Sequence, residues 1–565
     1  KPISQNGAND GLRALTKRTV SPDGSCGGSN TYTCPTGQCC SQYGYCGTTT
    51  AYCGTGCQSG FGTCSGSTPP TSTSTSTPSS ATPTSTTLQD CLGAKNVPVS
   101  FTNSAGFSAL AQPYNLRLAY TPAVIVLPTT TQHIIDAVLC AGKSNVKVQA
   151  KGGGHSYASF SSGGQNGAMV VDLESFQQIT VGAGGVAQIG GGVRLGDMAL
   201  GIFNQSQRAL PHGTCPGVGV GGHASHGGFG LDSRLWGLTL DTIVGLDVVL
   251  ANGSFIHATS TAYPDIYYAL RGAADSFGII TTFYLQTLPA PASVVNWQYS
   301  IPGMFASAAT STAVFAHIQT FAQNASVVDR KLGLGIYLDG SGFSVSGTYI
   351  GDLATFNSKI APELLRGLPT PSSSSVKAVD WIQSLTLLAN GQPLQQPTSR
   401  TSYTPHDDFF AKSLVVPSSA PLTTAALTSY FTYIIQNGVN APNPWYSIIN
   451  LYGGPDSQIN VPSPSSSAYS DRSALWVLQH YGYTGNTGSP YPPASLTFVN
   501  GLNTAITSAM PSTTFGGYLN YVDPSLTAAQ AHTLYYGTTT YAKLLSIKNV
   551  VDPGKVFSNP QSIGN

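Results

Sequence analysis

The sequence predicts an α+β protein that carries a small disulfide-rich module near its N-terminal end. Three observations lead to this prediction. Eight of the eleven cysteines lie between Cys26 and Cys64, helical and strand-like apolar patterns are mixed along the rest of the chain, and 565 residues are too many for one compact core. We therefore expect several domains that combine helices with sheets.

The expected elements can be placed along residues 89–565. Apolar residues fall at helical spacing in 131–143, and helices are also predicted at 308–322 and 529–546. Strands are predicted at 146–149, 169–172, 186–189 and 243–250. The apolar runs at 124–127 and 246–251 are far shorter than the ~20 residues that a membrane-spanning helix needs, so they predict buried strands.

Charge and cysteine content narrow the possible partners and environments. Charged residues make up 8% of the chain and the formal net charge is +1, so neither a nucleic-acid partner nor a membrane is expected. Dense cysteines indicate an oxidising compartment, and sequons at Asn204, Asn252 and Asn324 favour a secreted glycoprotein whose signal peptide has been removed. Lys17-Arg18 permits two interpretations, a propeptide that ends there or an uncut, flexible terminus.

Residues 26–64 form the small module, between an N-terminal segment at 1–25 and a Ser/Thr/Pro-rich linker at 65–88 that is typical of an O-glycosylated, extended tether. The order of all eight cysteines, including Cys39-Cys-Ser-Gln-Tyr-Gly-Tyr-Cys46, resembles the hevein-type chitin-binding fold. A module of ~40 residues needs disulfides in place of a core. The resemblance implies that N-acetylglucosamine oligomers are bound by Ser41, Tyr43, Tyr45 and Tyr52, with the aromatic faces stacked on sugar rings. The alternative is that these tyrosines pack on the disulfides.

Two glycine-rich segments stand out, Lys151-Gly-Gly-Gly-His-Ser-Tyr157 and His212-Gly-Thr-Cys-Pro-Gly-Val-Gly-Val-Gly-Gly222. Glycines let backbone amides approach a phosphorylated ligand closely, although no Rossmann fingerprint is present. Together with 227–230, 270–278 and 559–561, these segments resemble the berberine-bridge-enzyme-like flavin oxidases of the vanillyl-alcohol-oxidase superfamily. The resemblance implies a two-part FAD-binding domain at 89–290 and 506–565, and a central α+β substrate domain at 291–505 over a large antiparallel sheet.

The resemblance further implies one FAD bonded covalently through both His155 and Cys215, the first to the 8α-methyl group and the second to ring carbon 6. It also implies a Cys91–Cys140 bridge, which leaves Cys215 unpaired, and no metal is expected. The same resemblance implies that a small residue at Gly213 leaves room for dioxygen beside the flavin, which favours an oxidase. The other expected cofactor contacts belong to the glycine segments and the C-terminal signature: Gly152, Gly153, Gly154, Ser156, Gly217, Val218, Gly221, Gly222, Gly278 and Asn559.

The reacting centre is predicted around Tyr521, which matches the catalytic tyrosine of the resembled family. A phenol ionises near pH ~10, so a tyrosine that acts as a base must be tuned by its surroundings. Strand alternation is expected to place Tyr521 and its competitor Tyr518 on opposite faces. Asn450 is expected to hold the phenol by a hydrogen bond. Expected substrate contacts are Tyr157, Tyr446 and, more weakly, Arg330, each of which has an alternative as an ordinary core or surface residue.

These features predict a secreted, monomeric FAD-dependent oxidase that converts the reducing-end C1 hydroxyl of chitooligosaccharides to a lactone and then an aldonic acid, while dioxygen becomes hydrogen peroxide. The activity is implied by the resemblance. Three alternatives stay open. The sugar is a cello- or xylo-oligosaccharide, the electron acceptor is a quinone or a redox protein, or the chain is a chitin lectin with an inert oxidase-like part.

Overall fold

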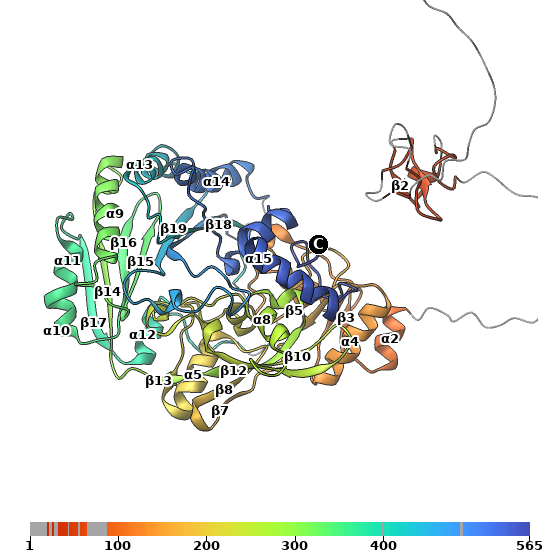
Figure 1. Ribbon diagram of the computed structural model, residues 1–565, viewed down its shortest axis with the longest axis horizontal. Coiled ribbons are helices and arrows are strands. Elements are labelled where there is room, and N and C mark those ends of the chain that lie inside the picture. The colour runs from red at the N-terminus through yellow and green to blue at the C-terminus, as the bar shows by residue number, and fades with distance from the viewer. Residues whose placement is uncertain are drawn as a thin grey trace, which may run out of the picture. The chain divides into compact units, whose positions relative to one another are not determined.

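The structure is a computed structural model of the whole chain, and it describes residues 20–21, 25–27, 32–42, 44–54, 57–64, 87–397, 399, 401–403, 405–485 and 490–565. The chain divides into two compact units, residues 1–84 and 85–565 (Figure 1). The proposed propeptide at 1–18, nearly all of the linker at 65–88, and Tyr43 lie outside the described residues. The inner domain boundaries of residues 89–565 stay predictions, because this part forms a single compact unit.

The small module is held together by four disulfide bonds. Its disulfides are Cys26–Cys40, Cys34–Cys46, Cys39–Cys53 and Cys57–Cys64. Regular structure within its described residues is limited to β1 (Cys39–Cys40), β2 (Cys46–Gly47) and α1 (Thr50–Cys53). Buried half-cystines form most of the interior, which is the solution expected for a module too small for an apolar core. The predicted disulfide framework is therefore confirmed.

A four-stranded sheet begins the larger unit. Its strand order is β3 (Val99–Phe101), β4 (Val124–Val126), β6 (Met169–Asp172) and β5 (Val148–Lys151), and the last three strands run parallel. Parallel strands are covered on both faces, which explains the apolar sequence of β4 and the nearly continuous apolar sequence of β6. Helix α4 (Thr131–Lys143) packs on this sheet, and Cys140 of α4 is bonded to Cys91 of α2 (Leu88–Ala94), as predicted.

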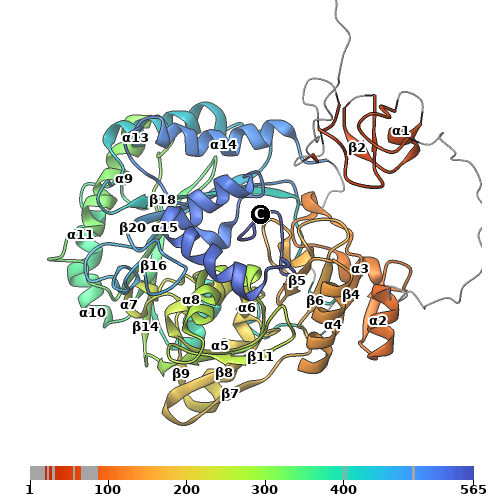
Figure 2. The same cartoon turned by 45° about the vertical axis from the view of Figure 1, so that its right-hand side comes forward.

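A five-stranded antiparallel sheet follows, in the order β11 (Phe255–Ala258), β10 (Ile243–Val249), β12 (Ile279–Gln286), β8 (Val186–Gly190) and β7 (Ile179–Val181). Its core is shared with α5 (Leu195–Ser206), α6 (Val220–Ser225) and α8 (Pro264–Ala273). The C-terminal helix α15 (Ala528–Val551) contacts α8 and lies against the same part of the molecule in both views (Figures 1 and 2).

The C-terminal end of the chain completes the first sheet. Phe557 pairs with Val148 of β5, and the buried ammonium of Lys548 donates to the carboxylate of Asp552 and to the carbonyl oxygens of Ser276 and Phe557. Two segments just over 400 residues apart therefore form one structural part, which confirms the expected two-part flavin-domain fold.

The middle of the chain forms a seven-stranded antiparallel sheet. The order is β17 (Ser373–Val379), β14 (Val294–Ser300), β16 (Phe343–Tyr349), β15 (Leu332–Leu338), β19 (Trp445–Leu451), β20 (Ala474–Tyr483) and β18 (Phe409–Pro417). Helices α9 (Ala308–Ala322), α13 (Thr424–Tyr433) and α14 (Pro493–Thr507) pack their apolar side chains on one face (Figure 1). The opposite face carries polar side chains such as Gln298, Ser346 and Asn450, and it borders a large cavity.

Most predicted elements are confirmed, with one correction near the reacting centre. The helices expected at 131–143 and 308–322 are observed with those bounds, and the one at 529–546 is α15, which is longer. The segment around Tyr521 is no strand, because Leu519–Tyr521 form a single turn of 3₁₀-helix, η10. None of the described helices is long and apolar enough to cross a membrane.

Candidate active site

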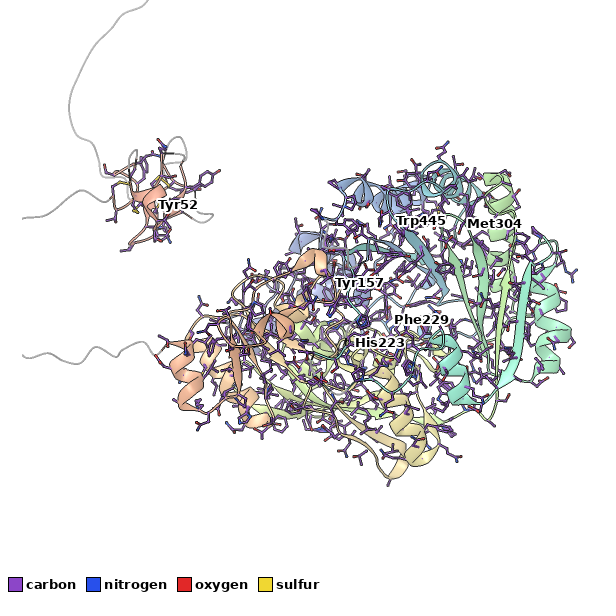
Figure 3. All side chains as sticks on the ribbon, turned by 180° about the vertical axis from the view of Figure 1, so that it is seen from behind. Tyr52, Tyr157, His223, Phe229, Met304 and Trp445 are labelled. Carbon is purple, nitrogen blue, oxygen red and sulfur yellow. A yellow bond between two sulfur atoms is a disulfide. The ribbon has the colours of Figure 1, made fainter. Side chains whose placement is uncertain are left out.

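A cavity of about 900 Å³ lies inside the larger unit, at the upper end of the roughly 300–1,000 Å³ usual for small-molecule sites. Its lining combines the two glycine segments, the C-terminal part of the chain and the polar face of the seven-stranded sheet. Figure 3 labels three of the lining side chains, Tyr157, His223 and Phe229, in the interior of this unit. Segments far apart in the sequence thus meet at one site.

The two glycine segments approach each other so closely that side chains are excluded. A Cβ at Gly153 would lie 2.3 Å from the backbone nitrogen of Gly219, and a Cβ at Gly219 would lie 2.1 Å from that of Gly153. By contrast, a Cβ at Gly222, which lines the cavity, would meet no atom within 4 Å. Glycine is therefore used at the first two positions for loop packing, and Gly222 borders open space that a ligand can occupy.

His155 follows β5 and lines the cavity. Its ring stacks on Tyr114 with 3.9 Å between centroids, and its Nε2 lies 2.6 Å from the hydroxyl of Tyr403. Burial, together with the nearby charges of Arg194 and His406, lowers the pKa of His155 to about 3. The imidazole is consequently neutral at physiological pH and retains nucleophilic character.

Cys215 is the free cysteine among the described residues. Its side chain is exposed to the cavity, although the surrounding protein raises the pKa of the thiol by burial, an effect that a hydrogen bond with Thr214 partly offsets. The preceding Gly213 also lines the cavity, and its N–H donates to Nε2 of His223 over 3.0 Å. An unpaired thiol and a neutral imidazole therefore face the same enclosed space.

Tyr521 occupies the wall of the cavity contributed by the C-terminal part of the chain. Its ring stacks on Tyr157 with 5.6 Å between centroids and meets Tyr518 edge-on at 4.9 Å. The amide of Gln479 donates to the hydroxyl of Tyr157 over 2.6 Å, which fixes that ring. Burial raises the pKa of Tyr521, and the neighbouring Tyr518 and Cys215 raise it further, so the phenol is neutral at pH 7.

One face of the seven-stranded sheet forms the floor of the cavity. Tyr446 and Asn450 are four residues apart on β19, so they share this face. Cross-strand pairing places a row of lining residues side by side on five strands: Asn450, Gly335, Ser346, Gln298 and Ser375. At about 4.8 Å per strand, the row extends roughly 19 Å, longer than a single sugar ring.

Several predicted site residues lie away from the cavity lining. Gly217 packs against Tyr403, Gly221 accepts a hydrogen bond from Ser225, and Gly278 packs on Val248. Asn559 is buried behind the wall, where its amide donates to the carboxylate of Asp275, a lining residue. Arg330 is exposed in the turn before β15 and is not among the residues that line the cavity, so its contact with substrate stays a prediction.

The remaining predicted flavin contacts do lie at the cavity. Gly152, Gly154, Ser156 and Val218 all belong to its lining. Sequence reasoning missed Arg194, Tyr403, Tyr114 and Gln479. Arg194 follows the glycines at 190–192, a signal that could have drawn attention to it, whereas Tyr403 belongs to no recognisable motif.

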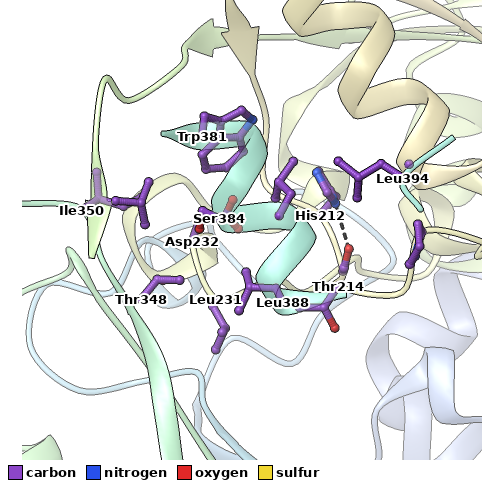
Figure 4. A pocket seen from close by; sticks show the side chains of 15 residues that line it. His212, Thr214, Leu231, Asp232, Thr348, Ile350, Trp381, Ser384, Leu388 and Leu394 are labelled. Carbon is purple, nitrogen blue, oxygen red and sulfur yellow. Dashed lines mark hydrogen bonds between the residues drawn. The ribbon is translucent and has the colours of Figure 1, made fainter. Parts of the chain in front are cut away.

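A second, much smaller cavity of about 20 Å³ is lined in part by Gly213 and by the residues labelled in Figure 4. His212, Asp232 and Thr348 line it, and each has a buried polar atom without a hydrogen-bond partner among the described residues. Burial raises the pKa of Asp232 to about 7, although the backbone N–H groups of Asp232 and His212 lower it in part. The space suffices for one water molecule.

In the small module, the predicted sugar-binding side chains differ in exposure. Tyr45 is 60% exposed, as a stacking platform requires. Tyr52 is half-buried and packs on Gly47, where a Cβ would lie 2.5 Å from the ring. Ser41 is buried, and its hydroxyl accepts a hydrogen bond from the N–H of Tyr45 over 3.3 Å.

Comparison with known protein families identifies three regions. Residues 25–64 match the chitin recognition protein family, residues 122–259 the FAD binding domain family, and residues 517–564 the berberine and berberine-like family. A chitooligosaccharide oxidase of Gibberella zeae is 34% identical over 84% of this chain and 94% of its own length, and a xylooligosaccharide oxidase of Thermothelomyces thermophilus is 35% identical with the same coverage.

The chain belongs to the family of FAD-dependent oligosaccharide oxidases. The solved structure of a chitooligosaccharide oxidase superimposes with a TM-score of 0.79 at 34% identity, covering 84% of this chain and 99% of that one. A glucooligosaccharide oxidase from Acremonium strictum, which carries a 6-S-cysteinyl, 8α-N1-histidyl FAD, superimposes with a TM-score of 0.79 at 32% identity and the same coverage. The cofactor of this oxidase family is FAD, and the residues present fit it, since the space beside Gly222, the free thiol and the neutral imidazole share one cavity.

Proposed function

We propose that this oxidase is secreted and oxidises the reducing-end C1 hydroxyl of chitooligosaccharides to a lactone, which hydrolyses to an aldonic acid, with dioxygen reduced to hydrogen peroxide. The observation that carries the choice of sugar is the chitin recognition module, which shares a chain with the oxidase unit. Five disulfides and the exposure of Asn204, Asn252 and Asn324 support an extracellular location.

The FAD is proposed to be held at both His155 and Cys215. Both side chains line the cavity. The imidazole of His155 is already neutral, as bond formation needs, whereas the thiol of Cys215 must first lose one proton. When bound, FAD supplies the acceptor for two electrons and a proton from the sugar. Gly222 leaves room for its backbone contacts, Gly152, Gly153 and Gly154 line the same cavity, and Asn559 acts from outside the lining by holding Asp275.

Tyr521 is proposed to accept the C1 hydroxyl proton of the sugar. The described groups that act on its pKa besides burial are Tyr518 and Cys215, neither of which is cationic. The phenolate that accepts a proton is therefore a minor species at neutral pH, and its share rises with pH. Asn450 lines the same cavity and, as an amide, orients a hydroxyl without exchanging protons with it.

The sheet floor is proposed to bind the remaining sugar units. Its row of hydroxyl and amide side chains provides hydrogen-bonding partners for sugar hydroxyls. Tyr446, whose ring stacks on Tyr481 at 4.9 Å, adds an aromatic side chain to the cavity lining. Tyr157 borders this floor next to Tyr521. The module is proposed to retain the enzyme on chitin through Tyr43, Tyr45 and Tyr52, and we propose that the enzyme is a monomer.

A hydrogen peroxide assay on a panel of oligosaccharides tests the proposal. The purified full chain is incubated with N-acetylglucosamine, cellobiose and xylobiose oligomers, first in air and then without oxygen but with a dye acceptor. We expect peroxide from the chitin series at the highest kcat/KM. Turnover confined to cellobiose or xylobiose would reject the proposed sugar, and turnover only with dye would reject dioxygen as the acceptor. The variant Tyr521→Phe, which keeps the ring stack with Tyr157, is expected to lose at least a hundredfold in kcat.

A further inference from the structure

Tyr403 lies in a segment to which the sequence assigned no function, yet it touches the proposed attachment site for FAD. Its hydroxyl is 2.6 Å from Nε2 of His155. Its ring also packs on Gly217, where a Cβ would lie 2.2 Å from the ring. Tyr403 therefore contacts both of the glycine segments that carry His155 and Cys215.

Arg194 contacts Tyr403 and both glycine segments. Its guanidinium lies 4.0 Å from the centroid of the Tyr403 ring, close enough for a cation–π contact. Nη1 of this guanidinium donates to the carbonyl oxygen of Gly153 over 2.9 Å and also to the carbonyl oxygen of Gly217. Arg194 is 5% exposed, so these bonds form away from water and tie the two segments together.

The imidazole of His155 is thus held on two sides. Tyr114 covers one ring face at 3.9 Å, and Tyr403 engages Nε2. Among the residues that the structure describes, none forms a hydrogen bond with Nδ1. Because one ring nitrogen is engaged, the other is left as the nitrogen available to an incoming group.

We propose that Tyr403 is the positioning residue for covalent FAD attachment at His155, because its hydroxyl occupies Nε2 and thereby selects Nδ1 as the atom that bonds. The inference rests on the proposed double attachment and deepens it. A hydroxyl both donates and accepts, so the contact persists through a change of tautomer. With Nε2–H donating to the Tyr403 oxygen, Nδ1 carries the free lone pair, and after attachment the hydroxyl donates to Nε2.

Atoms and electrons balance with dioxygen as the oxidant. Nδ1 forms a bond to the 8α carbon, which loses one hydrogen, and the imidazole loses the hydrogen formerly on Nε2. These two hydrogens leave as two protons and two electrons, which reduce dioxygen to hydrogen peroxide, the same product as in the proposed turnover. Burial raises the pKa of Tyr403, so this residue remains a neutral hydroxyl throughout.

The experiment isolates the histidine bond by removing the cysteine. Full-length Cys215→Ala and Cys215→Ala/Tyr403→Phe proteins are purified and precipitated with acid, and flavin is quantified in the pellet and in the supernatant. We expect pellet flavin to fall at least tenfold on removal of the hydroxyl, by analogy with the 10–100-fold losses when a metal-bound histidine loses its outer partner. Total flavin is expected to stay the same, because the cavity is intact. Cys215→Ala/Tyr446→Phe, which removes a cavity hydroxyl that does not touch His155, serves as the control.

The possible results separate the two proposals. Unchanged pellet flavin in the Tyr403→Phe variant would overturn the positioning role while leaving attachment at His155 intact. If total flavin fell by the same factor as pellet flavin, Tyr403 would be needed only to keep the cavity intact, and the positioning role would likewise be overturned. A colourless pellet from Cys215→Ala alone would refute attachment at His155 itself, and the inference with it. An equal loss in the Tyr446→Phe control would also contradict it.

Discussion

The buried carboxyl of Asp232 makes a quantitative prediction about stability. Its pKa of about 7, set by burial and only partly opposed by backbone N–H groups, exceeds the ordinary value of 3.8 by about three units. At ~1.4 kcal/mol per unit, the folded state gives up about 4 kcal/mol as the pH rises from about 4 to above 7, because the unfolded chain releases this proton much earlier. A water molecule in the adjacent cavity would lessen the loss (Figure 4).

The variant Asp232→Asn removes this titration while keeping the size of the side chain. An amide oxygen still accepts from the N–H groups of Asp232 and His212, so little change is expected at pH 5. At pH 8 the variant is expected to be the more stable protein. The assay is the melting temperature of the variant minus that of the parent, followed by circular dichroism at pH 5 and pH 8.

The predicted result is a difference that grows by several degrees in favour of the variant between pH 5 and pH 8. Asp265→Asn, which alters an exposed carboxylate at the start of α8, serves as the matched control and is expected to shift both temperatures equally. A difference that stays constant, or that shrinks toward pH 8, would refute the argument that Asp232 is a neutral acid in the folded protein.

Three further predictions concern the fold and the reaction. Lys548→Met is expected to destabilise the protein by about 3–5 kcal/mol, since it leaves the buried carboxylate of Asp552 unpaired; a denaturation midpoint within error of the parent would contradict this. Gly219→Ala is expected to force the two glycine segments apart and to lower flavin content severalfold, as measured by absorbance per mole of protein. Because burial raises the pKa of Tyr521, kcat/KM is expected to increase with pH from 6 to 9, and a plateau below pH 7 would argue against this residue as the base.

Local signals in the sequence predicted the fold well. The helix from Thr131 to Lys143 and the strand from Met169 to Asp172 follow from apolar spacing, and both are observed. The 3₁₀ turn at Leu519–Tyr521 was mistaken for a strand, because alternation over three residues cannot distinguish the two. The union of β5 with Phe557 depends on contacts between distant segments, and only the family resemblance indicated it.

The candidate site was predicted where motifs exist and missed where they do not. His155 and Cys215 lie in glycine-rich segments, and both face the cavity. Tyr403 lies in no recognisable motif. It matters because its hydroxyl contacts His155, which is 248 residues away in sequence. Arg330 was proposed for the cleft because it suits sugar hydroxyls, whereas the structure places it exposed in a turn outside the cavity lining.

The mass of the peptides that contain His155 and Cys215 tests the central claim most directly. Digestion of the purified enzyme is predicted to yield one cross-linked species, equal in mass to both peptides plus one FAD, less the hydrogens lost at each bond. Recovery of both peptides at the masses of their amino acids alone would contradict the account.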